Sequence, residues 1–195
     1  MSAVFDDSPP VMAPHRKLSA DDYHRMAEVG IFRPDERLEL IEGELIDMPP
    51  IGHFHAGLAN DLNRHFAPRI DGRAVASIRN PIRLCLHSEP QPDFALLRIR
   101  GDSYKRSLPT AADVLLVVEI SDTTVRYDRT VKLPLYARHG IPEYWLIDVP
   151  QRRVEVHFSP EPEQARYGEA RFLNDGPLAP ACFPDLALDV AELLS

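Results

Sequence analysis

Apolar side chains recur at helical spacing in three stretches of the chain. Ser19 opens the first stretch, with Asp22 three residues later as in a capping box, and Gly30 follows it as a stop. In the second stretch, Leu58 and Leu62 share one face with their apolar neighbours. We therefore predict helices over residues 19–29, 54–66 and 129–139, with a short helix at 189–194.

Other stretches alternate between apolar and polar positions, or are apolar throughout, and predict strands. The strongest is Asp113–Ile120, whose Val-Leu-Leu-Val-Val run is apolar on both faces, as in a central strand covered on both sides. Arg37–Met48 is typical of two short strands around a turn at Glu42-Gly43. Further strands are expected at 74–78, 82–86, 93–97, 143–148 and 153–158. This order predicts an α/β (α+β) fold, a mixed sheet flanked by helices.

The composition indicates a soluble globular protein, and its 195 residues suffice for one domain, which we expect over residues 18–195. Residues 1–17, rich in proline and aspartate near their start, are expected to form a disordered tail without a signal peptide. The longest apolar run is too short to cross a bilayer. Two cysteines without disulfide or metal-ligand spacing favour a reducing, cytoplasmic location.

Charge is unevenly distributed along the chain. The net charge of -8 argues against tight sequence-independent binding of nucleic acid, which depends on lysine and arginine contacts to phosphates. Residues 64–106 nevertheless carry 9 basic and 4 acidic side chains, a basic island in an acidic chain. The island is either a surface for the phosphate backbone or a solvated mixed surface. Its arginines are Arg64, Arg69, Arg73, Arg79, Arg83, Arg98 and Arg100.

Three residues far apart in the sequence are candidates for chemistry. Glu119 ends the most apolar strand, and a buried carboxylate needs a partner such as a metal ion or a lysine. Asp93 begins its own short strand after Pro92, so the two carboxylates can converge at one sheet edge and suit Mg²⁺. Lys132 follows 13 residues after Glu119, where an ammonium could stabilise phosphate charge.

Each candidate also has a structural interpretation. Asp93 could be a turn residue, Glu119 could pair with an arginine, and Lys132 could lie on the surface. His55 either lies close to the metal as a general base or caps its helix, and we favour the cap. The histidines lack metal-ligand spacing, which argues against zinc. Pro134 would distort a helix interior, so the third helix is expected to start near Lys132 rather than at residue 129.

Five segments in order resemble the Uma2 family of restriction-endonuclease-like proteins, within the PD-(D/E)XK nuclease superfamily. The segments are Leu40-Ile41-Glu42-Gly43-Glu44-Leu45, Gln91-Pro92-Asp93, Val117-Val118-Glu119-Ile120-Ser121, Asp128 with Lys132 and Tyr136-Ala137, and Gly140 to Asp148. The resemblance covers the chain from about Ser19 to Leu194. It implies a restriction-endonuclease-like fold and a metal-dependent endonuclease that uses Mg²⁺ or Mn²⁺. The expected reaction is hydrolysis of phosphodiester bonds in nucleic acid, with DNA as the expected substrate.

The resemblance also implies roles for particular residues. Asp93 and Glu119 would hold the metal, and Glu44 and Gln91 would lie near it. The superfamily usually has a lysine two residues after the second acid, where this chain has Ser121, so Lys132 is expected to replace it. Homodimers and nucleic-acid partners are expected on the same ground, and a membrane partner is not. The alternatives are a non-catalytic interaction module with a nuclease fold and another metal-dependent hydrolase on the same scaffold.

Overall fold

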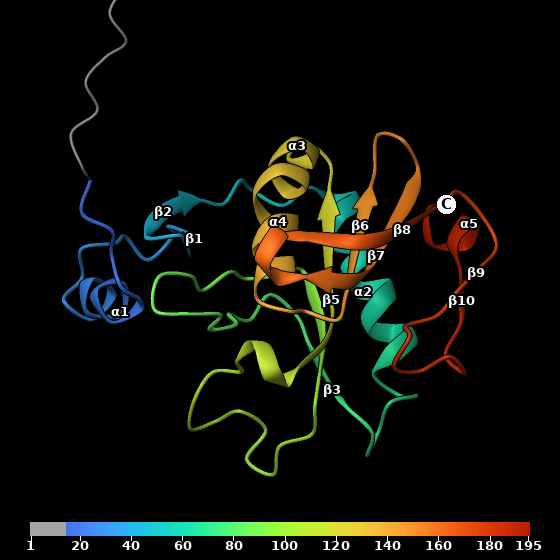
Figure 1. Cartoon of the computed structure of the whole chain (residues 1–195), viewed down its shortest axis with the longest axis horizontal. Coiled ribbons are helices and arrows are strands. Elements are labelled where there is room, and N and C mark those ends of the chain that lie inside the picture. The colour runs from blue at the N-terminus through green and yellow to red at the C-terminus, as the bar shows by residue number, and fades with distance from the viewer. Residues whose placement is uncertain (1–14) are drawn as a thin grey trace, which may run out of the picture.

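The structure, a computed structural model, describes residues 15–195, so the predicted disordered tail lies outside the described residues except for its last three positions. Its helical segments are α1 (Ala20–Glu28), α2 (His53–Phe66), η1 (Ala111–Asp113), α3 (Val125–Tyr127), η2 (Asp128–Lys132), α4 (Leu133–Arg138), η3 (Pro162–Gln164) and α5 (Val190–Leu193). Its strands are β1 (Leu38–Ile41), β2 (Glu44–Asp47), β3 (Val75–Ser77), β4 (Phe94–Leu97), β5 (Val114–Ser121), β6 (Glu143–Asp148), β7 (Arg153–Glu161), β8 (Arg166–Leu173), β9 (Pro177–Leu178) and β10 (Leu188–Asp189). The predicted mixed sheet with flanking helices is confirmed (Figure 1).

The main sheet has six strands in the order β3-β4-β5-β6-β7-β8. Only β5 and β6 run parallel, and the other neighbours are antiparallel. A parallel pair needs a crossover, which here is the helical segment from α3 to α4. The apolar run of β5 lies at the centre of the sheet, as its two-sided hydrophobicity predicted.

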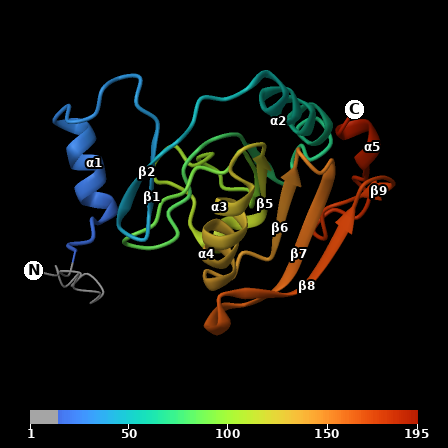
Figure 2. The ribbon, with the colours of Figure 1, turned by 90° about the horizontal axis from the view of Figure 1, so that it is seen from above.

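Two hydrophobic clusters cover the two faces of the sheet. On one face, Leu116, Val118 and Ile120 of β5 pack with Leu58 and Leu62 of α2 and with the C-terminal segment. On the other face, Val117 packs with Leu135 and Tyr136 of α4. Figure 2 shows α2 and α4 on opposite sides of the strands. Side chains of β5 therefore alternate between the α2 face and the α4 face, and this alternation determines where Glu119 lies.

The crossover helix is irregular at the point where it carries Lys132. Residues 128–132 form a π-helix, and the N–H of Leu133 bonds to the carbonyl of Asp128, five residues earlier. A proline in a regular α-helix clashes with the carbonyl four residues back. The wider π turn immediately before Pro134 relieves that clash, so the helix continues through residues 125–138 instead of starting near Lys132.

One predicted strand is wrong, and one long strand was not predicted. Residues 82–86 form only isolated bridges, because the N–H groups of Ile82 and Leu84 bond to loop carbonyls at Pro90 and Ser88 instead of to a neighbouring strand. Leu86, expected on an apolar face, is 56% exposed. The edge strand β8 was missed, since its largely exposed polar sequence has no alternation.

Helix α1 and the hairpin of strands β1 and β2 form a separate layer beside the sheet edge (Figure 1). The predicted capping box is present, with Ser19 Oγ accepting from the Asp22 N–H at 3.0 Å. Tyr23 Oη donates to the Leu38 carbonyl at 3.0 Å, which ties α1 to β1. Within residues 15–195, no helix is both long enough and apolar enough to span a membrane.

Candidate active site

Asp93 and Glu119 lie opposite each other on neighbouring strands. In the antiparallel pair of β4 and β5, Phe94 is opposite Val118. Continuing that register by one residue places Asp93 opposite Glu119, where Cβ atoms are typically about 4.5–5.5 Å apart. Glu119 alternates with Val118 and so points to the α4 face, as does Asp93 before Phe94. The topology thus brings both predicted carboxylates to one place on one face.

The Asp93 carboxylate is held by three groups. Oδ1 accepts from His55 Nε2 at 2.7 Å, and Oδ2 accepts from the backbone N–H of Ile120 at 2.9 Å. Arg79 Nε lies 3.5 Å from Oδ1. Burial opposes ionisation, but the hydrogen bonds from His55 and Ile120 and the nearby charges lower the pKa of Asp93 below its ordinary value. Asp93 is therefore an oriented carboxylate anion at neutral pH.

Glu119 is held by the crossover helix. Its Oε1 accepts from Lys132 Nζ at 3.1 Å and from Tyr136 Oη at 2.8 Å. Burial raises the pKa of Glu119 well above its ordinary value, Lys132 opposes that rise, and neighbouring carboxylates add to it. For Lys132, burial disfavours the charge, but the carboxylates outweigh it and raise its pKa. Within residues 15–195, Oε2 of Glu119 accepts no hydrogen bond and stays available to a ligand.

Glu39 is a third buried carboxylate at this site, and the sequence interpretation missed it. Its Oε2 lies 3.2 Å from Lys132 Nζ and accepts from the Gln91 backbone N–H at 3.2 Å. The Gln91 side chain donates to the Leu38 carbonyl at 2.8 Å. Gln91 thus fastens the Pro92-Asp93 turn to β1, so the hairpin, the turn and the crossover helix meet at Lys132.

The remaining predicted residues are placed differently. Glu44, expected near the metal, is exposed at the start of β2 and does not line the cavity described below. Ser121 is buried and donates to Asp128, which positions the start of the π-helix. His55, favoured as a helix cap, instead contacts Asp93 from the first turn of α2. The structure therefore does not bring Glu44 to the carboxylates, whereas it does bring His55.

A cavity of about 250 Å³ opens beside the carboxylates. Its floor is polar and buried: Glu119 is 3%, Lys132 5% and Asp93 9% exposed. Its other lining residues come mainly from the hairpin, from the loop before α2 and from the segment after β5, and include Ile46, Met48, Pro49, Ile51, Thr124 and Tyr127. The cavity is recessed, so a substrate must enter it to reach the carboxylates.

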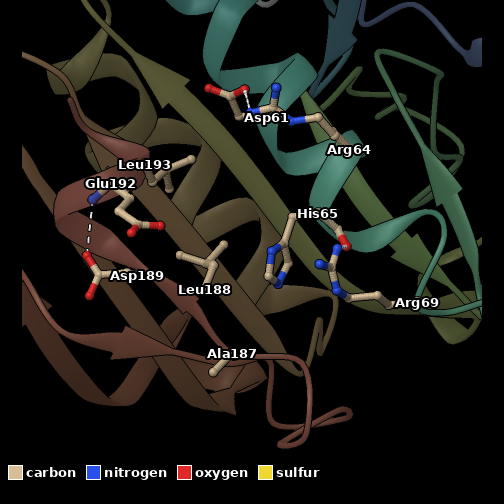
Figure 3. A pocket seen from close by; sticks show the side chains of 9 residues that line it. All are labelled: Asp61, Arg64, His65, Arg69, Ala187, Leu188, Asp189, Glu192 and Leu193. Carbon is tan, nitrogen blue, oxygen red and sulfur yellow. Dashed lines mark hydrogen bonds and ion pairs between the residues drawn. The ribbon is translucent and has the colours of Figure 1, made fainter.

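A larger cavity of about 510 Å³ lies on the α2 face of the sheet, between α2 and α5 (Figure 3). Arg64, His65 and Arg69 line it from α2 and the residues after it, and Asp189 and Glu192 line it from the C-terminal segment. The charges inside it are already partly paired, as between Arg64 and Asp61 at 2.8 Å. It is lined by neither Asp93 nor Glu119, so the smaller cavity is the candidate active site.

The donor set fits Mg²⁺ better than a metal that needs a closed cage. Within residues 15–195, no three His, Cys, Asp or Glu side chains are grouped so that they could hold a metal ion. Mg²⁺ commonly uses one or two carboxylates and completes its shell with water and substrate phosphates. Asp93 and Glu119, opposite each other with Oε2 of Glu119 available, supply that donor set.

The basic island does not form one free surface for phosphates. Arg73 pairs with Asp185, Arg83 with Glu89, and Arg100 with Asp102. Arg98 donates to the carbonyl of Ala112 and Arg69 to that of His65. Most of the island arginines therefore have intramolecular acceptors, as expected for a mixed surface. Arg79, beside Asp93, is the member closest to the carboxylates.

The comparisons with known proteins concern the family and the fold of the chain. A family model described as "Uma2: Putative restriction endonuclease" matches residues 20–191. The fold is similar to a crystal structure described as that of a putative nuclease belonging to DUF820 from Anabaena variabilis, with 16% sequence identity, a TM-score of 0.69, and coverage of 91% of this chain and 97% of that one. No curated protein matches the chain. The predicted resemblance is confirmed, and the chain belongs to the Uma2 family.

Proposed function

We propose that this protein is a Mg²⁺- or Mn²⁺-dependent endonuclease that hydrolyses phosphodiester bonds of nucleic acid, with DNA as the substrate to test first. The observation that carries the proposal is the meeting of two cross-strand carboxylates and one lysine at the floor of a cavity. Membership of a restriction-endonuclease family supports the same reaction class. Asp93 and Glu119 would hold the cation.

The side chains around the carboxylates have separate tasks. A divalent cation, when bound, lowers the pKa of a coordinated water and polarises a phosphate oxygen. Lys132 has three N–H donors, and Glu119 and Glu39 occupy two of them, so the third can donate to a phosphate oxygen. Tyr136 holds Glu119 in place by donating to Oε1.

His55 is a positioning residue in this proposal. Its Nε2 donates to Asp93 Oδ1, and the Ile120 N–H donates to Oδ2, so the carboxylate plane is fixed from both sides. Hydrogen bonds from such outer residues orient metal ligands and raise affinity for the ion. The close position of Arg79 adds positive charge next to Asp93.

A second candidate function is a non-catalytic interaction module on the nuclease fold. The observation that favours it is the ion pairing itself, because Lys132 already pairs with both Glu119 and Glu39. Such a module would need no cation. Measured binding of Mg²⁺ or Mn²⁺ therefore separates the two candidates before any substrate is known.

The test combines metal titration by calorimetry with cleavage of labelled DNA and RNA in Mg²⁺ or Mn²⁺. Asp93→Asn keeps the shape of the side chain but removes its charge, and we expect it to reduce metal affinity and cleavage by about 100-fold. Asp61→Asn, on α2 at the other cavity, is the matched control and should change neither. Cleavage that survives Asp93→Asn, or a wild type that binds no cation, would overturn the proposal.

A further inference from the structure

The candidate carboxylates lie too deep for a phosphate that remains in a stacked double helix. Glu119, Lys132 and Asp93 are almost completely buried, and they are reached through a cavity of about 250 Å³. Ligand pockets for small molecules typically measure about 300–1,000 Å³. A cavity somewhat smaller than that range can admit one nucleotide at most and not two paired strands.

The walls of the cavity differ chemically from its floor. Ile46, Met48, Pro49 and Ile51, from β2 and the loop before α2, form the apolar part of the lining, although Arg37 and Asp47 of the hairpin also line the cavity. A nucleotide has the matching division, since its phosphate is charged and its base has an apolar face. The phosphate suits Lys132 and the carboxylates, and the base suits the apolar wall.

Tyr127 is a residue of the cavity wall that carries a polar group. It lies at the end of α3, lines the cavity, and its hydroxyl is buried without a hydrogen-bond partner among the described residues. A buried hydroxyl without a partner is costly, so a small rotation of the Tyr127 ring toward the cavity would let a bound ligand satisfy it. Thr124, which also lines the cavity, already donates its hydroxyl hydrogen to Asp128 at 2.8 Å, so its hydroxyl, unlike that of Tyr127, has a partner.

We propose that the cavity is a subsite for one unpaired nucleotide, whose base packs on the Ile46–Ile51 wall and bonds to the Tyr127 hydroxyl. The protein would then act on single-stranded or locally unpaired nucleic acid. This inference rests on the proposed nuclease function for the reaction, but the binding subsite can be measured without cleavage. A paired base would have to leave its stack first, which costs a few kcal/mol.

The first test compares substrates. One labelled DNA strand is offered alone, in a full duplex, and in a duplex with a short unpaired gap, all with Mg²⁺. We expect kcat/KM for the single strand and for the gap to exceed that for the duplex by about tenfold or more. Equal or faster cleavage of the full duplex would overturn the subsite.

The second test measures binding, with Ca²⁺ replacing Mg²⁺ and a single strand that carries the fluorescent base 2-aminopurine. Tyr127→Phe removes only the hydroxyl, and should weaken binding about threefold or more for some bases and not for others. Ile51→Ala shortens the apolar wall and should raise Kd for every base. Ile99→Ala, at an exposed isoleucine that does not line the cavity, is the matched control and should change nothing.

The two proposals fail in different ways. If no nucleic acid is cut but 2-aminopurine fluorescence still responds to binding and to Tyr127→Phe, the nuclease proposal fails and the subsite stands. If cleavage depends on Asp93 but neither wall variant alters binding, the subsite is wrong and the nuclease proposal stands. An identical Kd for Tyr127→Phe, Ile51→Ala and wild type would by itself overturn the subsite.

Discussion

Two buried tyrosines lie next to each other on the α4 face, with ring centroids 5.4 Å apart, yet only one has a partner for its hydroxyl. Tyr136 Oη donates to Glu119 at 2.8 Å. The Tyr144 hydroxyl has no partner among the described residues. The pair therefore separates the effect of one hydrogen bond from the effect of burying a phenol.

Tyr136→Phe should lower the free energy of unfolding by about 1.5–3 kcal/mol, because Glu119 loses a donor in a buried place. Tyr144→Phe, the matched control, should leave the free energy of unfolding unchanged or raise it, since no bond is lost. Urea denaturation of both variants measures the difference. Equal losses would show that the Tyr136 hydrogen bond contributes nothing.

Glu155 on β7 connects the crossover helix to the sheet. It accepts from Arg129 of the π-helix and from Arg153 at 2.7 Å. Burial opposes its charge, but these hydrogen bonds lower the pKa of Glu155 below its ordinary 4.5. A carboxylate with a lowered folded-state pKa stabilises the protein above its unfolded pKa and loses that effect as pH falls through the folded value.

Glu155→Gln should therefore destabilise the protein most near neutral pH, and the difference from wild type should shrink as pH falls below 4.5. Thermal unfolding at a series of pH values measures it. Glu163→Gln, on the exposed η3, is the control and should show no such trend. A difference that grows toward acid pH would reverse the assigned sign.

Single residues could be predicted from sequence only where their neighbours gave a local signal. Glu119 stood out because it interrupts an apolar run, and Asp93 because it follows Pro92 at a strand start. Glu39 gave no such signal, because its burial depends on Lys132, which is distant in the sequence. Glu44 was expected near the metal because of the family resemblance, and the alternation of a short hairpin could not show that it faces solvent.

At the scale of elements, the β1–β2 hairpin depends on its turn. Glu42 and Gly43 both have positive φ, 50° and 84°, as in the turns that suit two-residue hairpins. A Cβ on Gly43 would lie 2.5 Å from Lys17 Cβ, because the chain before α1 packs on the turn. The hairpin carries Glu39, so the turn also affects the position of Lys132.

Gly43→Ala should destabilise the protein through both a left-handed φ and a steric clash. Gly72→Ala is the matched control, since Gly72 has a similar φ of 69° but nothing within 4 Å of its added Cβ. We expect about 1–2 kcal/mol for the control from backbone strain and about 1–3 kcal/mol more for Gly43→Ala. Equal melting temperatures for both variants would show that Lys17 yields without cost.

Most elements could be predicted because their patterns are local, and the exceptions have physical causes. Residues 82–86 alternate like a strand, but Pro81 and Pro90 beside them restrict the chain and their N–H groups bond to loop carbonyls. The edge strand β8 faces solvent along most of its length, so no buried face imposed a pattern on it. The π turn before Pro134 could not be predicted, because the usual rule that a proline marks a helix start takes no account of a wider turn that accommodates it.

At the scale of the whole molecule, the sequence indicated the layers of the fold but not the surface. The mixed sheet followed from the order of helices and strands. The sequence analysis left the role of the basic island open, because composition cannot show whether an arginine side chain already has an acceptor within the protein. The structure gives Arg73, Arg83 and Arg100 such acceptors, so these three arginines are not free to bind phosphates.

The parallel pairing of β5 with β6 has a consequence for how the protein matures. Parallel neighbours cannot be joined by a tight turn, so the chain must close a long loop before β6 can dock, and such non-local closure is slow. That loop is the segment that delivers Lys132 to Glu119. Because one segment does both, we expect the β5–β6 pairing and the Lys132–Glu119 ion pair to form together, and a chain stalled before that step would lack both.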